Sequence, residues 1–242
     1  MAYSLKATEK PAKVVQAPKA RIKIDDLKTF TPLTENQKLF FSSYKVGEYF
    51  MMLSGSAGTG KSFIALYKAL EEVMDRSNSF ETLLIVRSAV QTRDVGFLKG
   101  TLEEKTSLYE EPYVQICSIL LDRKDAYQKL KEQGVIQFTT TTAMRGMSFD
   151  NSIVVVDECQ NMTFQELDTV VTRIGHQSKI IFVGDTSQND LLKKSNDCTG
   201  MPDFIKIATS MKEFVRIHFT SADIVRSSLV KSYIIAKENL GF

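Results

Sequence analysis

The 242-residue sequence has only three cysteines and two histidines, and it has no long hydrophobic run. Its three cysteines, Cys117, Cys159 and Cys198, are not spaced in pairs, which argues against a disulfide framework or a zinc ribbon and favours a reducing compartment. The two histidines, His176 and His218, have no neighbouring pattern of a metal site. No apolar run approaches the ~20 residues that cross a bilayer, and the N-terminus shows no signal-peptide segment. These absences predict a cytoplasmic globular protein without membrane contact.

Positive charge is concentrated at the N-terminus. The formal net charge is +2, from 31 basic and 29 acidic residues. Segment 1–23 holds six basic residues and one acid, so the remainder carries 25 basic and 28 acidic residues, or −3. We expect residues 1–28 to form a flexible basic arm and residues 29–242 a single domain. Such an arm either contacts nucleic-acid phosphates or only solubilises the chain.

Apolar runs alternate with helical patterns through the rest of the chain. Strands are predicted at 49–53, 82–87, 135–139, 152–156, 179–183 and 214–219. Helices are predicted at 34–44, 61–74, 108–121, 124–133, 163–174 and 221–238, and a loop at 195–201. Thr34 and Thr163 are the expected N-caps, with Glu166 completing a capping box. This alternation predicts an α/β fold with a parallel β-sheet flanked by helices on both faces.

The most specific motif follows the first predicted strand. Residues 55–62 read G-S-A-G-T-G-K-S and match the phosphate-binding P-loop pattern G-x-x-x-x-G-K-S/T. Glycines let backbone N–H groups wrap a phosphate, and the following helix turns its positive end toward the same anion. Lys61 is expected to reach the β- and γ-phosphates, and the Ser62 hydroxyl to hold Mg²⁺. The predicted nucleotide-binding residues of this loop are Gly55, Ser56, Ala57, Gly58, Thr59, Gly60, Lys61, Ser62 and Phe63.

Polar residues also end two later strands. Residues 153–156, all Ile or Val, lead into Asp157 and Glu158. Asp157 is placed to bind Mg²⁺ as a Walker B acid does, and Glu158 to orient or deprotonate the attacking water. The strand pattern allows another strand between the P-loop strand and the Asp157 strand, as in the P-loop class with a catalytic glutamate. Residues 184–188 read G-D-T-S-Q, and Gln188 is expected to reach the γ-phosphate because adjacent parallel strands share one crevice.

Taken together, these motifs resemble those of the PhoH family of ATPases, which is related to the first domain of superfamily 1 helicases. The ordered series comprises 87–90 (R-S-A-V), 96–105 (G-F-L-K-G-T-L-E-E-K), 144–149 (M-R-G-M-S-F), 157–161 (D-E-C-Q-N), 172–175 (T-R-I-G) and 184–188. The resemblance implies a RecA-like P-loop core, ATP hydrolysis with Mg²⁺, and association with RNA or single-stranded nucleic acid. The sequence departs from the family pattern at Ser88, Lys99, Thr101, Met147 and Cys159.

The resemblance also suggests contacts for the base and for a nucleic acid. Gln37 lies in L-T-E-N-Q, which resembles the helicase glutamine motif that pairs with adenine, although a lone helical Gln is commonly just solvated. Thr141 and Thr142 before Arg145 resemble the helicase T-x-x-x-R-G segment that contacts a nucleic-acid backbone, or they only end a strand. Further nucleic-acid candidates on this resemblance are Arg87 and Ser88.

These motifs are not accompanied by a second motor domain. Subtracting 158 from 242 leaves 84 residues after Glu158, and these are needed to finish the first domain. We therefore expect the active site to be completed between subunits of a closed, hexameric ring. The candidate arginine fingers are Arg145, Arg173 and Arg226.

Three other functions use related motifs. A nucleoside kinase of thymidine-kinase type also joins a P-loop to D-E-x-Q, but usually carries four paired zinc-binding cysteines. An ATP-linked ribonuclease would use the same acidic cleft with a metal. A GTP switch is disfavoured because no N-K-x-D segment occurs. The expected function is an ATP-hydrolysing motor, helicase or remodeller acting on RNA or single-stranded DNA, with the first two alternatives open.

Overall fold

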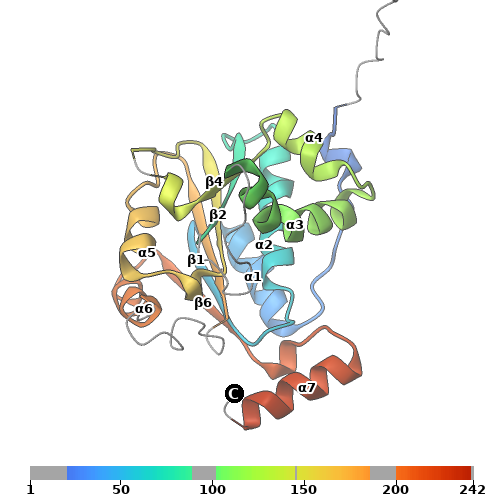
Figure 1. The fold of residues 1–242 in the computed structure, drawn as a ribbon, viewed down its shortest axis with the longest axis vertical. Helices are drawn as coiled ribbons and strands as arrows, with labels where there is room; N and C mark the ends of the chain where they lie inside the picture. Colours follow the sequence, from blue (N-terminus) through green and yellow to red (C-terminus); the bar gives the residue numbers. More distant parts are fainter. Residues whose placement is uncertain (1–20, 89–101, 145, 186–199, 241–242) are drawn as a thin grey trace, which may run out of the picture.

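A parallel six-stranded sheet forms the centre of the protein. The computed structural model describes residues 21–88, 102–144, 146–185 and 200–240. The strands lie side by side in the order β3-β2-β4-β5-β1-β6, and every neighbouring pair is parallel (Figure 1). Their bounds are β1 Phe50–Gly55, β2 Thr82–Arg87, β3 Ile136–Thr140, β4 Ser152–Asp157, β5 Lys179–Gly184 and β6 Phe214–Phe219.

Helices cover both faces of this sheet. Figure 1 shows α1 to α4 on one side and α5 and α6 on the other. In β1, Met51 and Leu53 pack into the core on the α1–α4 side, whereas Phe50 and Met52 pack into the second core. The predicted α/β fold of a RecA-like P-loop NTPase is therefore confirmed. The helices are α1 Glu35–Val46, α2 Lys61–Met74, α3 Leu102–Leu121, α4 Ala126–Glu132, α5 Phe164–Val171, α6 Met201–Thr209 and α7 Ser228–Asn239.

Local capping signals set the helix starts that the sequence predicts. Thr34 caps α1, since its hydroxyl accepts the Gln37 N–H at 3.3 Å. Thr163 and Glu166 form the predicted capping box at the start of α5. Gly47 ends α1 in the left-handed region, at φ 100°, where glycine carries no steric cost.

The C-terminal helix begins later than the sequence predicts. Instead of one helix over 221–238, a 3₁₀ turn spans Ser221–Asp223 and α7 starts only at Ser228. Thr220 and Asp223 close the turn with a capping box. The Val225 N–H then donates to the Gly58 carbonyl at 3.1 Å, so this backbone bonds to the P-loop rather than to its own helix. The prediction of one continuous helix was wrong because the hydrogen bond to Gly58 replaces a hydrogen bond within the helix.

A further helix was not predicted. Helix α6 begins at Met201, within the segment predicted as a loop, and carries Pro202 in its first turn. It buries Met201, Phe204 and Ala208 in the core that α5 shares. Residues 195–199 of that predicted loop lie outside the described residues.

The described chain starts within the predicted basic arm. Ile22 is buried against the core, and the Lys28 N–H donates to the Leu120 carbonyl at 2.8 Å. Residues 21–28 therefore pack on the body, whereas residues 1–20 lie outside the described part of the chain. Within the described part, no helix combines the length and apolarity needed to cross a bilayer.

Candidate nucleotide-hydrolysis site

The P-loop lies where β1 ends and α2 begins. Gly55 has φ 118°, and a Cβ there would lie 1.9 Å from the Phe219 carbonyl oxygen, so only glycine fits. Gly58 and Gly60 also have positive φ, at 72° and 82°, and Gly60 precedes the first residue of α2. The first N–H groups of α2 have no partner within the helix and carry its positive dipole end, which is what an anionic phosphate requires.

Lys61 is held inside the loop. Its side chain is 8% exposed, and Nζ donates to the carbonyls of Ser56 at 2.6 Å and Gly55 at 3.0 Å. Burial lowers the pKa of the ammonium, whereas the carboxylates of Asp185 and Glu158 act in the opposite direction. A phosphate would therefore bring Lys61 a charged partner in place of neutral carbonyls.

The Walker residues meet although 95 positions separate them in the sequence. Ser62 Oγ donates to Asp157 Oδ1 at 2.8 Å. Strand β5 lies between β1 and β4, as the sequence allowed, so both side chains reach the same carboxyl edge of the sheet. Tyr113 of α3 donates to the other Asp157 oxygen at 3.0 Å and is fully buried. Asp157 is thus oriented by two hydroxyl groups.

Glu158 has an unusual backbone conformation and a fixed carboxylate. Its φ of 53° lies in the left-handed region, which costs a non-glycine residue energy and occurs often at functional sites. Gln160 Nε2 donates to Glu158 Oε2 at 2.6 Å, and Gln160 Oε1 accepts the Asp185 N–H at 3.0 Å. Burial, with a smaller effect of the Asp157 charge, raises the pKa of Glu158, as suits a proton acceptor.

One cavity of about 740 Å³ joins these groups. Lys61, Ser62, Asp157 and Glu158 lie on its phosphate side. A hydroxyl and a carboxylate 2.8 Å apart are oxygen donors of the kind that Mg²⁺ prefers, and phosphate oxygens would complete its shell. The residues therefore fit an Mg²⁺–nucleotide complex. Among the described residues there is no cluster of three or more His, Cys, Asp or Glu side chains for an all-protein metal site.

The candidate arginine fingers lie in different places in the structure. Arg226 lines this chain's own cavity, and its Cγ lies against Gly58. Arg173 does not line the cavity and donates to the Met147 carbonyl at 3.5 Å. Arg145 and Gln188 lie outside the described residues. Of the two described candidates, Arg226 is therefore the one that lines the nucleotide cavity of its own chain.

Two of the four described nucleic-acid candidates, Ser88 and Thr141, contact Glu166. Ser88 and Thr141 both donate to Glu166 Oε1, at 3.3 and 2.5 Å, and both are largely buried. Thr142 is exposed, with its hydroxyl 3.0 Å from that of Thr140. Arg87 instead lines the nucleotide cavity and lies over the Tyr109 ring at 5.8 Å.

Three residues of the site were missed by sequence reasoning. Gln160 had a signal, the fourth position of D-E-C-Q-N, but was given no role. Glu166 was assigned only as a helix cap. Tyr113 had no signal, because nothing local in α3 indicates which side chain faces Asp157.

Comparison with known proteins agrees with this geometry. Residues 29–238 match the family described as "PhoH-like protein". The chain is 30% identical over 210 residues to a PhoH-like protein of Mycobacterium tuberculosis (strain ATCC 25618 / H37Rv), covering 86% of this chain and 58% of that protein. It is 33% identical over 187 residues to a PhoH-like protein of Bacillus subtilis (strain 168), covering 75% and 56%. The chain thus spans less than two thirds of either relative.

A solved structure shows a more distant likeness. The Pif1 helicase from Candida albicans superposes with a TM-score of 0.44 and 14% identity, covering 88% of this chain and 44% of that one. The fold assignment rests on the strand order and the P-loop geometry of this chain. On the match over residues 29–238, the chain belongs to the PhoH-like protein family.

Proposed function

We propose that the protein hydrolyses ATP and uses the reaction to act on RNA or single-stranded DNA. The observation that carries the proposal is the 2.8 Å bond between Ser62 and Asp157, with Lys61 and Glu158 lining the same cavity. A site that only binds a nucleotide needs no carboxylate other than the one that binds Mg²⁺. Here a second carboxylate follows directly and is held by Gln160.

Each side chain has a separate task in this proposal. Lys61 would bind the β- and γ-phosphates, while the N–H groups at the start of α2 hold the same anion. The Mg²⁺ that Ser62 and Asp157 would hold supplies positive charge to the phosphates. Glu158 would take the proton of the attacking water, and its raised pKa favours that transfer near neutral pH.

The exposed Thr142 supports a nucleic-acid role, whereas Ser88 and Thr141 are buried and donate to Glu166. In the sheet, Arg87 at the end of β2 lies in register with Thr140 on one side and Asp157 on the other. Ser88 therefore follows the strand directly beside that of Asp157, and the segment of Thr141 and Thr142 follows the next strand, with β2 between them. A nucleic acid bound there would sense changes at the phosphates through β2. The exposed Thr142 is available to a phosphate backbone.

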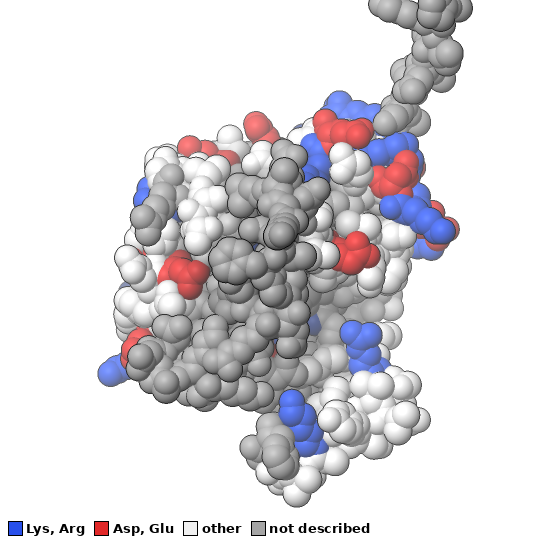
Figure 2. Space-filling model, in the orientation of Figure 1, with Lys and Arg blue, Asp and Glu red and all other residues white. Residues whose placement is uncertain are grey.

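Helix α7 supports a site completed between subunits. It buries no residue of its own, and it leaves Leu229, Tyr233 and Leu240 about 70–80% exposed. Figure 1 shows it standing off the sheet layers, and the surface over it in Figure 2 is mostly uncharged. Ile234 and Arg226 lie against Gly58, so this helix adjoins the P-loop. A neighbouring copy covering α7 would sit beside the nucleotide, where Arg145 or Arg173 of that copy could neutralise the γ-phosphate.

Phosphate release measured alone and with RNA, single-stranded DNA or thymidine tests this function. We expect RNA or DNA to stimulate release, Lys61→Ala to abolish it, and Glu158→Gln to bind ATP while slowing turnover by about a hundredfold or more. Phosphorylated thymidine would support the kinase alternative. Shortening of the RNA itself would support the ribonuclease. Normal turnover in Lys61→Ala would overturn the P-loop assignment.

A further inference from the structure

Arg87 ends strand β2 at the carboxyl edge of the sheet, directly beside the strand that carries the Walker B acid. It lies in register with Asp157, the last residue of β4. Its side chain lines the nucleotide cavity together with Lys61, Asp157 and Glu158. The family resemblance makes Arg87 a nucleic-acid candidate, whereas in the structure it lies among residues on the phosphate side of the nucleotide cavity.

The guanidinium of Arg87 is only weakly held. Nη1 donates to the Tyr109 carbonyl at 3.5 Å, near the limit for a hydrogen bond, and the group lies 5.8 Å from the centre of the Tyr109 ring. Among the described residues Arg87 forms no ion pair. The hydrogen bond engages one of its five N–H groups, and the planar fork of these groups suits the oxygens of a phosphate.

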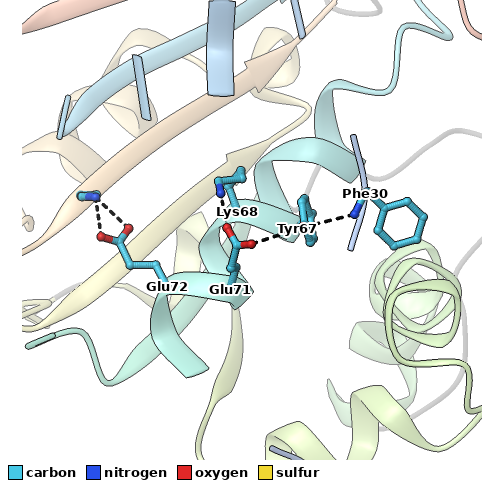
Figure 3. A network of polar contacts seen from close by, with 6 residues as sticks. Phe30, Tyr67, Lys68, Glu71 and Glu72 are labelled. Atoms are coloured by element: carbon cyan, nitrogen blue, oxygen red, sulfur yellow. Dashed lines mark hydrogen bonds and ion pairs between the residues drawn. The ribbon is translucent and has the colours of Figure 1, made fainter. Parts of the chain in front are cut away.

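Other partly buried cations of the chain have carboxylate partners. Lys68 of α2 pairs with Glu71, as Figure 3 shows. Lys179 Nζ lies 2.7 Å from both oxygens of Glu72. A partly buried charge without a counter-charge costs free energy. The unpaired guanidinium of Arg87 beside the cavity therefore indicates an anion that the ligand supplies.

The charges around Glu158 agree with an anion at this position. Burial raises the pKa of Glu158 and the Asp157 charge adds to this effect, whereas the Gln160 hydrogen bond and the Arg87 charge act in the opposite direction. The guanidinium is thus near enough to act on the carboxylate that would accept the proton of water. A γ-phosphate beside Glu158 brings two negative groups together, so a cation on this side, in addition to Lys61, would lower their repulsion.

We infer that Arg87 binds the γ-phosphate of ATP from within the same chain, on the side where Glu158 faces the attacking water. Lys61 reaches the phosphates from the P-loop after β1 and Arg87 from the end of β2, with β5 and β4 between these two strands. The charge on the γ-phosphate oxygens in the transition state would then face a cation on each side. An arginine of a neighbouring copy, entering beside α7 and Gly58, would act in addition to Arg87. The inference rests on the proposed ATP hydrolysis and adds a contact to its substrate.

The test compares the affinity for ADP with that for a non-hydrolysable ATP analogue, both with Mg²⁺, in the wild type and in Arg87→Gln. A contact with the γ-phosphate changes only the affinity for the ATP analogue. We expect Arg87→Gln to weaken binding of the analogue by about ten- to a hundredfold, the range of a hydrogen bond to a charged group, and binding of ADP by less than about twofold. The kcat/KM for ATP should fall by at least the same factor as the affinity for the analogue, because the contact persists in the transition state.

Two further variants complete this experiment. Arg87→Lys keeps the charge but lacks the fork, so it should recover part of the lost affinity for the ATP analogue. Arg76→Gln removes an exposed arginine outside the cavity and is the matched control, which should change neither affinity. Circular dichroism compares the fold of the variants. If Arg87→Gln does not fold, Arg87→Lys still provides the test, since it should weaken binding of the analogue more than binding of ADP.

A pH profile separates a phosphate contact from an effect exerted only through Glu158. Loss of the Arg87 charge raises the pKa of Glu158, so the acidic limb of kcat should move to higher pH. Such a shift with unchanged affinity for the ATP analogue would overturn the inference and make Arg87 a positioning residue for the base. An equal loss of affinity for ADP and for the analogue would also overturn it, since Arg87 would then only support the site.

The wild type separates this inference from the proposed function. Failure of the wild type to bind or hydrolyse ATP would refute the proposed function and the inference with it. A wild type that hydrolyses ATP, compared with an Arg87→Gln variant of equal affinity for the ATP analogue, would refute the inference alone.

Discussion

The amide nitrogen of Gln160 lies 2.6 Å from the Glu158 carboxylate, while its amide oxygen accepts the Asp185 N–H at 3.0 Å. One side chain thus ties the carboxylate that follows β4 to the backbone that follows β5. Gln160 is 4% exposed, so both bonds are made by a buried side chain. A general base must be aimed correctly, and the Gln160 bond fixes one oxygen of the Glu158 carboxylate.

Gln160→Leu should lower kcat by about ten- to a hundredfold while KM for ATP changes little, because orientation of the base matters only in the chemical step. Steady-state phosphate release measures both values. Gln165→Leu, on the exposed face of α5, is the matched control. An unchanged kcat would mean that Gln160 supports the strand ends but not Glu158.

Tyr113→Phe should raise the Mg²⁺ concentration needed for half-maximal turnover by about three- to tenfold, because Asp157 loses a donor that orients it. It should also lower stability by about 1 kcal/mol, through loss of a buried hydrogen bond. Titration of turnover with Mg²⁺ and urea denaturation measure the two effects. Tyr127→Phe removes a comparable bond, to Glu110 at 2.6 Å, away from the site. It should lose stability without a shifted Mg²⁺ response, and an equal shift in both variants would contradict the role of Tyr113.

Deleting residues 1–20 should weaken RNA binding and make it less sensitive to salt. The cut leaves the buried Ile22 in place. It removes four lysines and one glutamate, a net +3. If the arm contacts phosphates, the slope of log affinity against log salt should fall by about two to three, at about 0.7 per phosphate contact with a single strand. An unchanged slope would mean that the arm only solubilises the chain.

Leu229→Glu combined with Tyr233→Ser should dissociate the assembly, because both side chains are largely exposed on α7 and a charge there opposes burial. Analytical ultracentrifugation should show a smaller species with reduced turnover. Lys38→Ala and Glu35→Ala, which remove a surface ion pair on α1, serve as the control. A wild type that is fully active as a monomer would exclude the subunit-completed site.

Mixing inactive proteins tests the same idea by complementation. Lys61→Ala subunits lack phosphate binding, whereas Arg173→Ala or Arg145→Ala subunits would lack the residue supplied to a neighbour. Some interfaces of a mixed assembly would hold both intact groups, so part of the activity should return with one of the two arginines. An arginine finger contributes about 10³–10⁵ in rate in related phosphoryl transfer, so even partial recovery is measurable. No recovery with either arginine would place the missing charge within the chain.

The sequence by itself determined the features that depend on neighbouring residues. The P-loop, the six strands, the caps at Thr34 and Thr163, and the polar residues Asp157 and Glu158 at a strand end all follow from short patterns, and the structure contains each of them. These patterns succeed because glycine conformations, helix caps and buried Val/Ile runs are set by local sterics and hydrogen bonds. The sequence pattern allowed a strand between the P-loop strand and the Asp157 strand, and in the structure β5 lies there.

Only the tertiary structure decided which distant groups meet. Tyr113 reaches Asp157 from α3, and Ser88 and Thr141 turn to Glu166 because packing brings their elements together. Gln37 lines the nucleotide cavity and also bonds through its amide to Leu33 and Thr59, contacts that its local sequence does not indicate. Residue 225 leaves the expected helix because its N–H finds the Gly58 carbonyl. In each case a polar group had several possible partners, and the partner was chosen by the long-range contacts that form only when the sheet and its helices assemble.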